Sequence, residues 1–266
     1  MGNLSIRPLN TGFVSPSKTL FYYETLVSTY NPPDIQKETP VFCFLVEGGD
    51  RPLMVDTGLS STEHARQHHN PAPYQPEGMS VLEQLKKAGY APEDIGYVVL
   101  THLHWDHCSY LPYFKNARFF AHPTEIAFAA NPLPMYCRPY EHPVIGIQSP
   151  YSGLRLEPVT EGDEIIPGIS ILDTPGHSPG HITVCVNAPS GEYLCVGDAI
   201  LHMDNLKEVD AGGVHYSITP PGRFTNLLEC WNSISTLKAR AKFPDYLLLA
   251  HDKSLVQRVK ETPVLR

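Results

Sequence analysis

The stretch that decides the fold is Thr101-His-Leu-His-Trp-Asp-His107, which follows a short apolar run at residues 97–100. The apolar run predicts a buried strand, and the turn that follows it carries four potential metal ligands. These ligands are His102, His104, Asp106 and His107. Imidazole and carboxylate groups together suit zinc, and also iron, manganese or cobalt. The stretch therefore predicts a metal site at the end of a strand.

Three further candidate ligands stand in the same kind of position, directly after an expected strand. They are His177 in Thr-Pro-Gly-His, Asp198 in Val-Gly-Asp and His251 in Ala-His-Asp. Loops at the ends of strands are where a rigid scaffold presents functional groups. Five histidines and two aspartates are enough ligands for two metal ions that share a carboxylate. The sequence therefore predicts a dinuclear metal centre.

Composition narrows the class of protein. The chain has 266 residues, 28 acidic against 20 basic side chains and a formal net charge of −8. An acidic chain is a poor match for a nucleic-acid surface, which needs a basic patch. No window reaches the roughly 18 apolar residues of a membrane span, and the N-terminus lacks the apolar core of a signal peptide. The six scattered cysteines indicate reduced thiols, so we expect a cytoplasmic protein that binds neither nucleic acid nor membrane.

Strand and helix patterns alternate along the chain. Apolar runs predict strands at residues 41–46, 52–56, 97–100, 118–121, 169–173, 182–186, 193–196 and 246–250. Helical spacing predicts helices at residues 79–88, 123–130 and 223–240, and a terminal helix after the last strand. Residues 60–78 are polar and proline-rich and are expected to form a loop. The pattern predicts an α/β (α+β) fold with central sheets and outer helices, as one domain over residues 1–266.

The combined motifs, His-x-His-x-Asp-His, Pro-Gly-His, Gly-Asp and a late histidine, resemble the metallo-β-lactamase superfamily, and within it the N-acyl-homoserine lactone lactonase group. The resemblance implies an αββα sandwich, with two central mixed sheets flanked by helices and two divalent metal ions, expected to be Zn2+, at one edge. It assigns three ligands to each ion: His102, His104 and His177 to the first, and Asp106, His107 and His251 to the second. It also makes Asp198 the bridge between the ions, and gives Asp56 the task of orienting ligand histidines from behind.

The resemblance further implies a hydrolase that opens a small cyclic ester, a lactone, through attack of a metal-bridging hydroxide on the carbonyl. Asp106 would hold the attacking water and pass its proton to the leaving oxygen. The lactonases carry a tyrosine three residues after the bridging aspartate, where it contacts the substrate carbonyl, but this chain has Leu201 there. His202 and Tyr216 are the candidates for the missing contact.

Other interpretations of the same ligands stay open. A lactam or other cyclic amide hydrolase is a close variant, and a glyoxalase II-like thioesterase would need cationic groups for an anionic thiol carrier. Lys207, Arg223 and Lys253 are available, but they form no cluster in the sequence. A metal-binding protein without turnover is a further alternative, and the intact ligand set argues against it. The resemblance also suggests a homodimer that acts on a small-molecule substrate.

The remaining expectations concern the residues that face the substrate and the histidines that are not candidate ligands. Residues 131–155, which we call the proline-rich loop, are expected to cover the binding site, with Met135 and Tyr136 against the substrate. Residues 21–23 would extend this apolar surface around the substrate. His181 is expected to form structural hydrogen bonds, and Trp105 to pack at the base of the site. The other histidines are expected to be solvated (His64, His68 and His69) or to lack a partner (His122 and His142).

Overall fold

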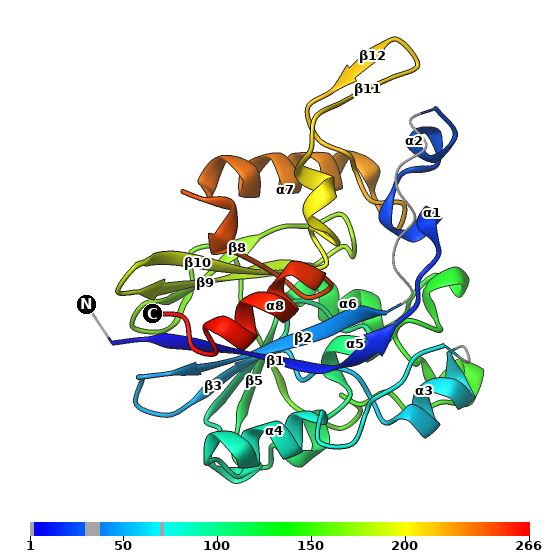
Figure 1. The fold of residues 1–266 in the computed structure, drawn as a ribbon. Coiled ribbons are helices and arrows are strands. Elements are labelled where there is room, and N and C mark those ends of the chain that lie inside the picture. The colour runs from blue at the N-terminus through cyan, green and yellow to red at the C-terminus, as the bar shows by residue number, and fades with distance from the viewer. Residues whose placement is uncertain (1–2, 30–37, 70–71) are drawn as a thin grey trace.

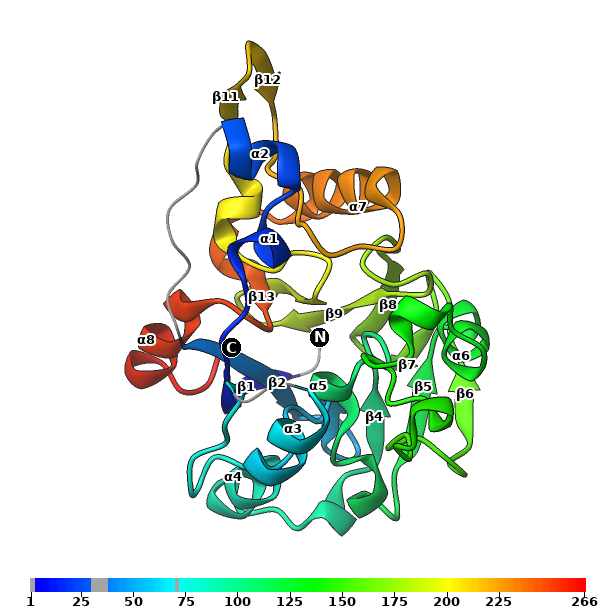
Figure 2. The same ribbon diagram turned by 90° about the vertical axis from the view of Figure 1, so that its right-hand side faces the viewer.

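Two β-sheets face each other at the centre of the structure, a computed structural model that describes residues 3–29, 38–69 and 72–266. The larger sheet contains, in spatial order, β1 (Ser5–Val14), β2 (Thr39–Glu47), β3 (Leu53–Val55), β4 (Tyr97–Val99), β5 (Arg118–Ala121) and β6 (Leu156–Pro158). The smaller sheet contains β13 (Leu247–Leu249), β10 (Gly191–Gly197), β9 (Ile182–Ala188), β8 (Ile169–Asp173) and β7 (Glu164–Ile166). A separate hairpin, β11 (Val209–Ala211) and β12 (Val214–Tyr216), projects from the body next to α2 (Glu24–Thr29) (Figures 1 and 2).

Alternation of side chains along the strands sets the layers of the fold. In β2, Phe42, Phe44 and Val46 belong to the core between the two sheets, whereas Cys43 and Leu45 pack on the outer side of the larger sheet. Strand β9 alternates between the inner core and the outer side of the smaller sheet in the same way. Because successive side chains of a strand point to opposite faces, both faces of each sheet are apolar here and both need a cover.

Helices cover the two outer faces. The larger sheet is covered by α4 (Val81–Ala88) and α6 (Pro123–Ala130), and the smaller sheet by α7 (Leu227–Arg240). Figure 1 shows α7 on one side of the molecule and α4 on the other, with both sheets between them. The C-terminal helix α8 (Lys253–Glu261) adds Leu255 to the core between the sheets. The predicted αββα sandwich is therefore confirmed.

Strand directions bring several strand ends to the same edge of the sandwich. Strands β3, β4 and β5 run parallel in the larger sheet. In the smaller sheet β10 and β13 run parallel, and β8 has the same direction because both β8 and β10 pair antiparallel with β9. The candidate ligands follow the carboxyl ends of four of these strands, namely β4, β8, β10 and β13.

Some elements differ from the expectation. The segment 60–78 contains a helix, α3 (Thr62–His68), which Ser61 caps by accepting from the backbone N–H of His64; residues 70–71 of that segment lie outside the described residues. Strand β1 was not predicted, and neither were β6, β7 and the hairpin. Helix α7 begins at Leu227 instead of residue 223, because the side chain of Asn226 caps it.

The other short elements connect the layers. They are α1 (Lys18–Phe21), α5 (Trp105–Cys108) and the 3-10 helices at Pro92–Asp94, Leu111–Tyr113, Pro134–Tyr136, Pro143–Ile145, Met203–Leu206 and Pro244–Tyr246. All six cysteines are buried free thiols, as expected from their scatter in the sequence. None of the helices in the described ranges combines the length and the apolarity that crossing a bilayer requires.

Substitution of Phe44 tests the core between the sheets. Phe44 is 1% exposed and belongs to the cluster that both sheets share. We expect Phe44→Ala to lower the free energy of unfolding by about 3–5 kcal/mol, because it leaves a cavity where the two sheets meet. Urea unfolding followed by circular dichroism measures the change. The matched control is Leu228→Ala, at a position that is 68% exposed, and an equal effect of both substitutions would contradict the assignment of Phe44 to the core.

Candidate metal centre

The candidate ligands come from both sheets and meet at the edge where the strands end. The motif of residues 101–107 follows β4, and its second half forms the short helix α5. The other ligands follow three strands of the smaller sheet: His177 after β8, Asp198 after β10 and His251 after β13. Their ligand atoms fall into three overlapping groups, each with atoms within 4.8 Å of one another: His102, His104 and His177; His102, His107 and Asp198; Asp106, His107 and His251.

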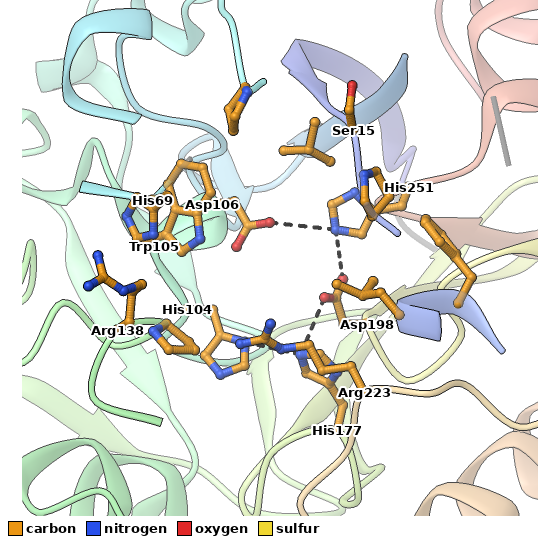
Figure 3. Close-up of a pocket in the computed structure, with 16 residues that line it drawn as sticks. Ser15, His69, His104, Trp105, Asp106, Arg138, His177, Asp198, Arg223 and His251 are labelled. Atoms are coloured by element: carbon orange, nitrogen blue, oxygen red, sulfur yellow. Dashed lines mark hydrogen bonds and ion pairs between the residues drawn. The ribbon is translucent and has the colours of Figure 1, made fainter. Parts of the chain in front are cut away.

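Asp198 lies between the two halves of this cluster. Its Oδ2 is 3.3 Å from Nε2 of His177 and 4.0 Å from Nε2 of His102. Its Oδ1 is 3.2 Å from Nε2 of both His107 and His251. Figure 3 shows Asp198 with His177 on one side and His251 on the other. Each carboxylate oxygen therefore faces a different pair of histidines, which is the arrangement that a carboxylate shared by two cations requires.

The buried carboxylate of Asp56 determines which nitrogen of two ligand histidines faces the cluster. Nδ1 of His107 lies 2.8 Å from Asp56 Oδ2, and the Thr101 hydroxyl donates to the same oxygen at 2.8 Å. Because the Thr101 hydroxyl gives its proton to Asp56, its oxygen accepts from Nδ1 of His102 at 3.1 Å. With both Nδ1 atoms protonated, the Nε2 lone pairs of His102 and His107 are left to face the cluster. This geometry supports the orienting role expected of Asp56.

A backbone carbonyl orients His251 in the same manner. The carbonyl oxygen of Pro40 lies 2.9 Å from Nδ1 of His251. A carbonyl can only accept, so Nδ1 carries the proton and Nε2 presents its lone pair to Asp106 and Asp198. Hydrogen bonds of this kind, made by the far nitrogen of a ligand histidine, are typical of metal centres.

Unpaired buried atoms test whether the cluster fits a cation. Among the described residues, the buried side-chain atoms without a hydrogen-bond partner include Nε2 of His102, Nε2 of His107 and Oδ1 of Asp198, which all face the cluster. In His104 and His177 the nitrogens that face the cluster are Nδ1 and Nε2, which lie 3.0 Å from each other, and the opposite nitrogens are the unpaired ones. An unsatisfied buried polar atom costs about 1–3 kcal/mol, so a set of them in one place is unfavourable unless their lone pairs have another partner. Imidazole nitrogen and carboxylate oxygen are the ligands that zinc takes in hydrolases. The donor set therefore fits divalent cations.

Burial and the two aspartates set the charges of the cluster. Burial lowers the pKa of His102 and His104 well below the ordinary histidine value, and neighbouring imidazoles lower it further. Burial acts on His107 too, but Asp198 and Asp56 raise its pKa by more than burial lowers it. Burial alone would raise the pKa of Asp198, but the surrounding histidines hold it well below its usual range. The ionised Asp198 and the neutral His102 and His104 are in the protonation state that metal binding requires, whereas His107, whose pKa is raised, would release a proton when a cation binds.

Glu125, which sequence analysis did not single out, joins three of the loops around the cluster. Its buried Oε1 accepts from the backbone N–H of Leu103 at 3.0 Å and from the Tyr140 hydroxyl at 2.7 Å. Its Oε2 accepts from the Ser178 hydroxyl at 2.7 Å and from the backbone N–H of Gly180 at 3.1 Å. The carboxylate thus ties the turn after β4, the proline-rich loop and the turn after β8 to one another. In the sequence it is one glutamate in the first turn of a helix, so no local signal marks it.

His181 forms the structural hydrogen bonds predicted for it. Its Nε2 accepts from the backbone N–H of Asp198 at 3.1 Å, and its Nδ1 lies 3.0 Å from the hydroxyl oxygen of Thr174. Burial lowers the pKa of His181 to about 3, and the neighbouring His177 contributes in the same direction. A neutral His181 therefore holds the backbone of the central aspartate in place.

A cavity of about 210 Å³ opens beside the cluster (Figure 3). Five of the candidate ligands line it: His104, Asp106, His177, Asp198 and His251. The N-terminal segment and the loops add apolar side chains and two arginines, namely Leu20, Phe21, Trp105, Pro139, Arg138 and Arg223. Phe21, one of the three residues at 21–23 expected to face the substrate, therefore lines the cavity, and the proline-rich loop reaches it through Arg138 and Pro139.

The four residues predicted to contact the substrate lie outside this lining. Met135 is 71% exposed, and the Tyr136 hydroxyl donates to a backbone carbonyl at 2.9 Å. Nδ1 of His202 accepts from a backbone N–H at the start of a 3-10 helix, and Tyr216 lies on the projecting hairpin. Position in the sequence placed these residues near the site, but local hydrogen bonds and the course of the chain direct them elsewhere.

Leu201, where the lactonase pattern has tyrosine, is buried. It is 1% exposed and packs with Phe21 and Tyr22. This position therefore offers the cavity no hydroxyl group, and any polar contact to a substrate carbonyl has to come from another residue.

Two histidines expected to be solvated contact a buried carboxylate instead. Nε2 of His64 and Nε2 of His69 lie 2.6 and 2.8 Å from the same oxygen of the buried Glu141. The His69 ring also stacks on Trp105, with the ring centroids 3.7 Å apart, so Trp105 packs against His69 at the cavity. Two further histidines, expected to lack partners, each cap the helix that follows: His122 and His142.

The comparisons with known proteins agree with this geometry. The sequence profile described as the Metallo-beta-lactamase superfamily matches residues 37–240, which is more than half of the chain. The chain belongs to the metallo-β-lactamase superfamily. The matched residues include every candidate ligand except His251, which follows the last strand of the smaller sheet.

Within the superfamily, this member is similar to N-acyl homoserine lactonases. It is 30% identical to the N-acyl homoserine lactonase of Bacillus cereus over 206 residues, which cover 74% of this chain and 78% of that protein. A lactonase of Rhizobium radiobacter is 24% identical over 251 residues, with 88% and 89% covered. A solved N-acyl homoserine lactone hydrolase with N-hexanoyl-L-homoserine bound at its metal centre has a TM-score of 0.77 at 21% identity, and 97% of both chains is covered.

Substitution of Asp56 tests its control over the ligand histidines. We expect Asp56→Asn to weaken zinc binding by about 10–100-fold. The carboxylate accepts on both oxygens, from the Thr101 backbone N–H on Oδ1 and from the Thr101 hydroxyl and Nδ1 of His107 on Oδ2, whereas an amide has an NH2 group in place of one of these oxygens. Competition with a chromogenic chelator measures the affinity. Asp50→Asn is the matched control, since Asp50 is exposed and bonds only to the Tyr97 hydroxyl among the contacts described. Unchanged zinc affinity in Asp56→Asn would contradict the orienting role.

The depressed pKa of His181 predicts a pH dependence of stability in the metal-free protein. A histidine that titrates at about 3 when folded and near 6.5 when unfolded binds its proton only on unfolding between these values. Stability is therefore complete above pH 6.5 and falls as the pH drops toward 3, by up to about 1.4 kcal/mol per pH unit for this group. Urea unfolding at several pH values, with chelator present, measures the slope. His181→Gln should reduce the slope, and an equal slope in both proteins would exclude His181 as its source.

Proposed function

We propose that this superfamily member is a dinuclear metal-dependent hydrolase that opens lactones. The observation that carries the proposal is the position of Asp198, whose two carboxylate oxygens face two different pairs of histidines at 3.2–4.0 Å. Similarity to N-acyl homoserine lactonases supports the ester as the bond that is cleaved. A solved neighbour of the same fold is described as a dizinc quorum-quenching lactonase, and it supports zinc as the ion.

The residues present would hold two cations. His102, His104 and His177 would bind one ion, Asp106, His107 and His251 would bind the other, and Asp198 would bind both. When bound, such a pair of cations supplies a water that is acidic near neutral pH and an electrophile for the carbonyl oxygen.

Asp106 is the residue we assign to proton transfer. It lines the cavity, and its Oδ2 lies 3.7 Å from Nε2 of His251. Its side chain is 16% exposed, more than that of Asp198 at 7%, so it can reach both the cluster and a bound substrate. It would accept a proton from the attacking water and deliver it to the ring oxygen as the ring opens.

The rest of the cavity would hold the lactone ring. Leu20, Phe21 and Pro139 give it apolar walls beside the cluster. The proline-rich loop is anchored there, because the backbone N–H of Trp105 donates to the carbonyl of Pro139 at 2.9 Å. We infer that this loop covers the substrate and that residues 1–266 act as one domain around the shared core. A homodimer stays a prediction from the resemblance.

A hydrolysis panel with a ligand variant tests the function. We expect the zinc-loaded protein to open short N-acyl homoserine lactones and γ-butyrolactones, and to cleave matched lactams and thioesters more slowly. His104→Ala should lose one zinc ion per chain and at least about 100-fold in kcat/KM, because it removes a ligand of the group near His177. Metal content by mass spectrometry and ester opening by pH-stat measure the two effects.

The control for this variant is a histidine far from the cluster. His215 lies on the projecting hairpin with a side chain that is 60% exposed, so His215→Ala should keep both metal and activity. Full activity of His104→Ala would contradict the proposed centre. If the zinc-loaded protein cleaves a lactam but no lactone, it is a cyclic amide hydrolase. If it cleaves a thioester but no lactone, it is a thioesterase.

A further inference from the structure

The described lining of the cavity beside the metal centre contains two arginines, and its acidic side chains are all candidate metal ligands. Arg138 and Arg223 line it, and within the described lining the only carboxylates are Asp106 and Asp198, both candidate metal ligands. With divalent cations bound, those two carboxylates are already engaged. The cavity is thus locally positive, although the chain as a whole carries a net charge of −8.

Arg223 has no acidic partner among the contacts of the described residues. Figure 3 shows its side chain lying beside the imidazoles of His104 and His177. Both histidines and Arg223 line the same cavity. An arginine kept beside a cationic centre without a counter-ion is unfavourable in the free protein, so its charge is available for a ligand.

Backbone hydrogen bonds hold the segment that carries Arg223 from two sides. The N–H groups of Gly222 and Arg223 donate to the carbonyl of Leu20 at 3.1 and 3.2 Å. The N–H groups of Thr225 and Asn226 donate to the carbonyl of Gly176, next to a candidate ligand, at 2.7 and 3.1 Å. The segment is therefore fixed between the apolar wall and the metal centre.

Two further features fix the backbone of this segment: Gly222 lies close to the carbonyl of Thr19, and the carbonyl of Phe224 accepts a hydrogen bond from Tyr136. A side chain at Gly222 would place its Cβ 1.8 Å from the carbonyl oxygen of Thr19, so only glycine fits there. The Tyr136 hydroxyl donates to the carbonyl of Phe224 at 2.9 Å, which links the proline-rich loop to the same segment. This fixed backbone positions the Arg223 guanidinium before any ligand binds.

We propose that this site takes a small lactone that carries a carboxylate beside its ring, and that Arg223 binds that carboxylate, while Arg138 adds positive charge to the wall of the same cavity. The inference rests on the proposed lactonase function and names its substrate class. A guanidinium fork matches a carboxylate with two parallel hydrogen bonds, and the apolar wall of Leu20 and Phe21 suits the ring. The cavity of about 210 Å³ is smaller than the roughly 300–1,000 Å³ that encloses drug-sized ligands, so the substrate is small.

Two lactones that differ only in charge test the proposal. One is γ-butyrolactone with a carboxylate on the ring carbon next to the ring oxygen, and the other is its neutral carboxamide. We expect the zinc-loaded protein to prefer the carboxylate by at least about 10-fold in kcat/KM, because a hydrogen bond to a charged partner is worth about 10–100-fold. Added salt should lower the rate with the carboxylate more than with the carboxamide.

Variants of Arg223 assign the preference to that residue. Arg223→Ala should bring the carboxylate preference close to one, and Arg223→Lys should retain part of it, because lysine keeps the charge but not the fork. Arg155→Ala is the matched control, since Arg155 is exposed and outside the cavity lining, and it should keep the preference. An equal loss on both lactones in Arg223→Ala would overturn the proposal, because the residue would then act on the ester that both share.

A binding measurement separates this proposal from the lactonase function itself. Cyclopentanecarboxylate has the ring and the charge but no ester, and cyclopentanecarboxamide is its neutral match. Calorimetry should show tighter binding of the carboxylate, by about 10-fold or more, and Arg223→Ala should remove the difference. If neither lactone is opened but this difference holds, the lactonase function fails and anion recognition stands. If the carboxylate binds equally to both proteins, the metal ions alone hold it and the role of Arg223 is excluded.

Discussion

The metal centre depends on one buried carboxylate, that of Asp56. It accepts from Nδ1 of His107 and, through Thr101, determines the protonated nitrogen of His102. The turn that holds it is demanding, because Asp56 has a φ of +59°, and a side chain at Gly58 would lie 2.3 Å from the Thr11 hydroxyl. Strand β1 supplies that Thr11, so the first strand of the chain supports the turn that orients ligands from the fourth. Two candidate ligands thus owe their orientation to a residue that touches no metal.

A second buried carboxylate gives the surrounding loops a common anchor. Glu125 accepts hydrogen bonds from the turn after β4, from the turn after β8 and from the proline-rich loop. The first two turns come from different sheets, so this one side chain fixes the two halves of the sandwich relative to each other at the site. Ligand geometry and the shape of the cavity are therefore coupled, because the loop that helps to form the cavity shares its anchor with the ligand turns.

The layers and the ligands could be predicted from the sequence because each has a strong local signal. Strands such as β2 and β9 are apolar on both faces, and the ligand residues follow strands directly. Strand β1 escaped prediction because Pro8, Asn10 and Thr11 interrupt its apolar pattern. The contact of His69 with Glu141 spans 72 positions, and Glu125 reaches residues up to 55 positions away. Such long-range pairs leave no periodic trace. The sequence likewise does not show that His202 and Tyr216 lie outside the lining of the cavity.

The unpaired nitrogens of the ligand cluster have a consequence for the life of the protein in a cell. A chain without its cations keeps several desolvated lone pairs in its interior, whereas a loaded chain satisfies them and gains the free energy of binding. The unloaded chain therefore opens more often, and proteases act on the open form. Degradation would then remove unloaded copies first, so the amount of this protein would follow the supply of metal without any dedicated sensor.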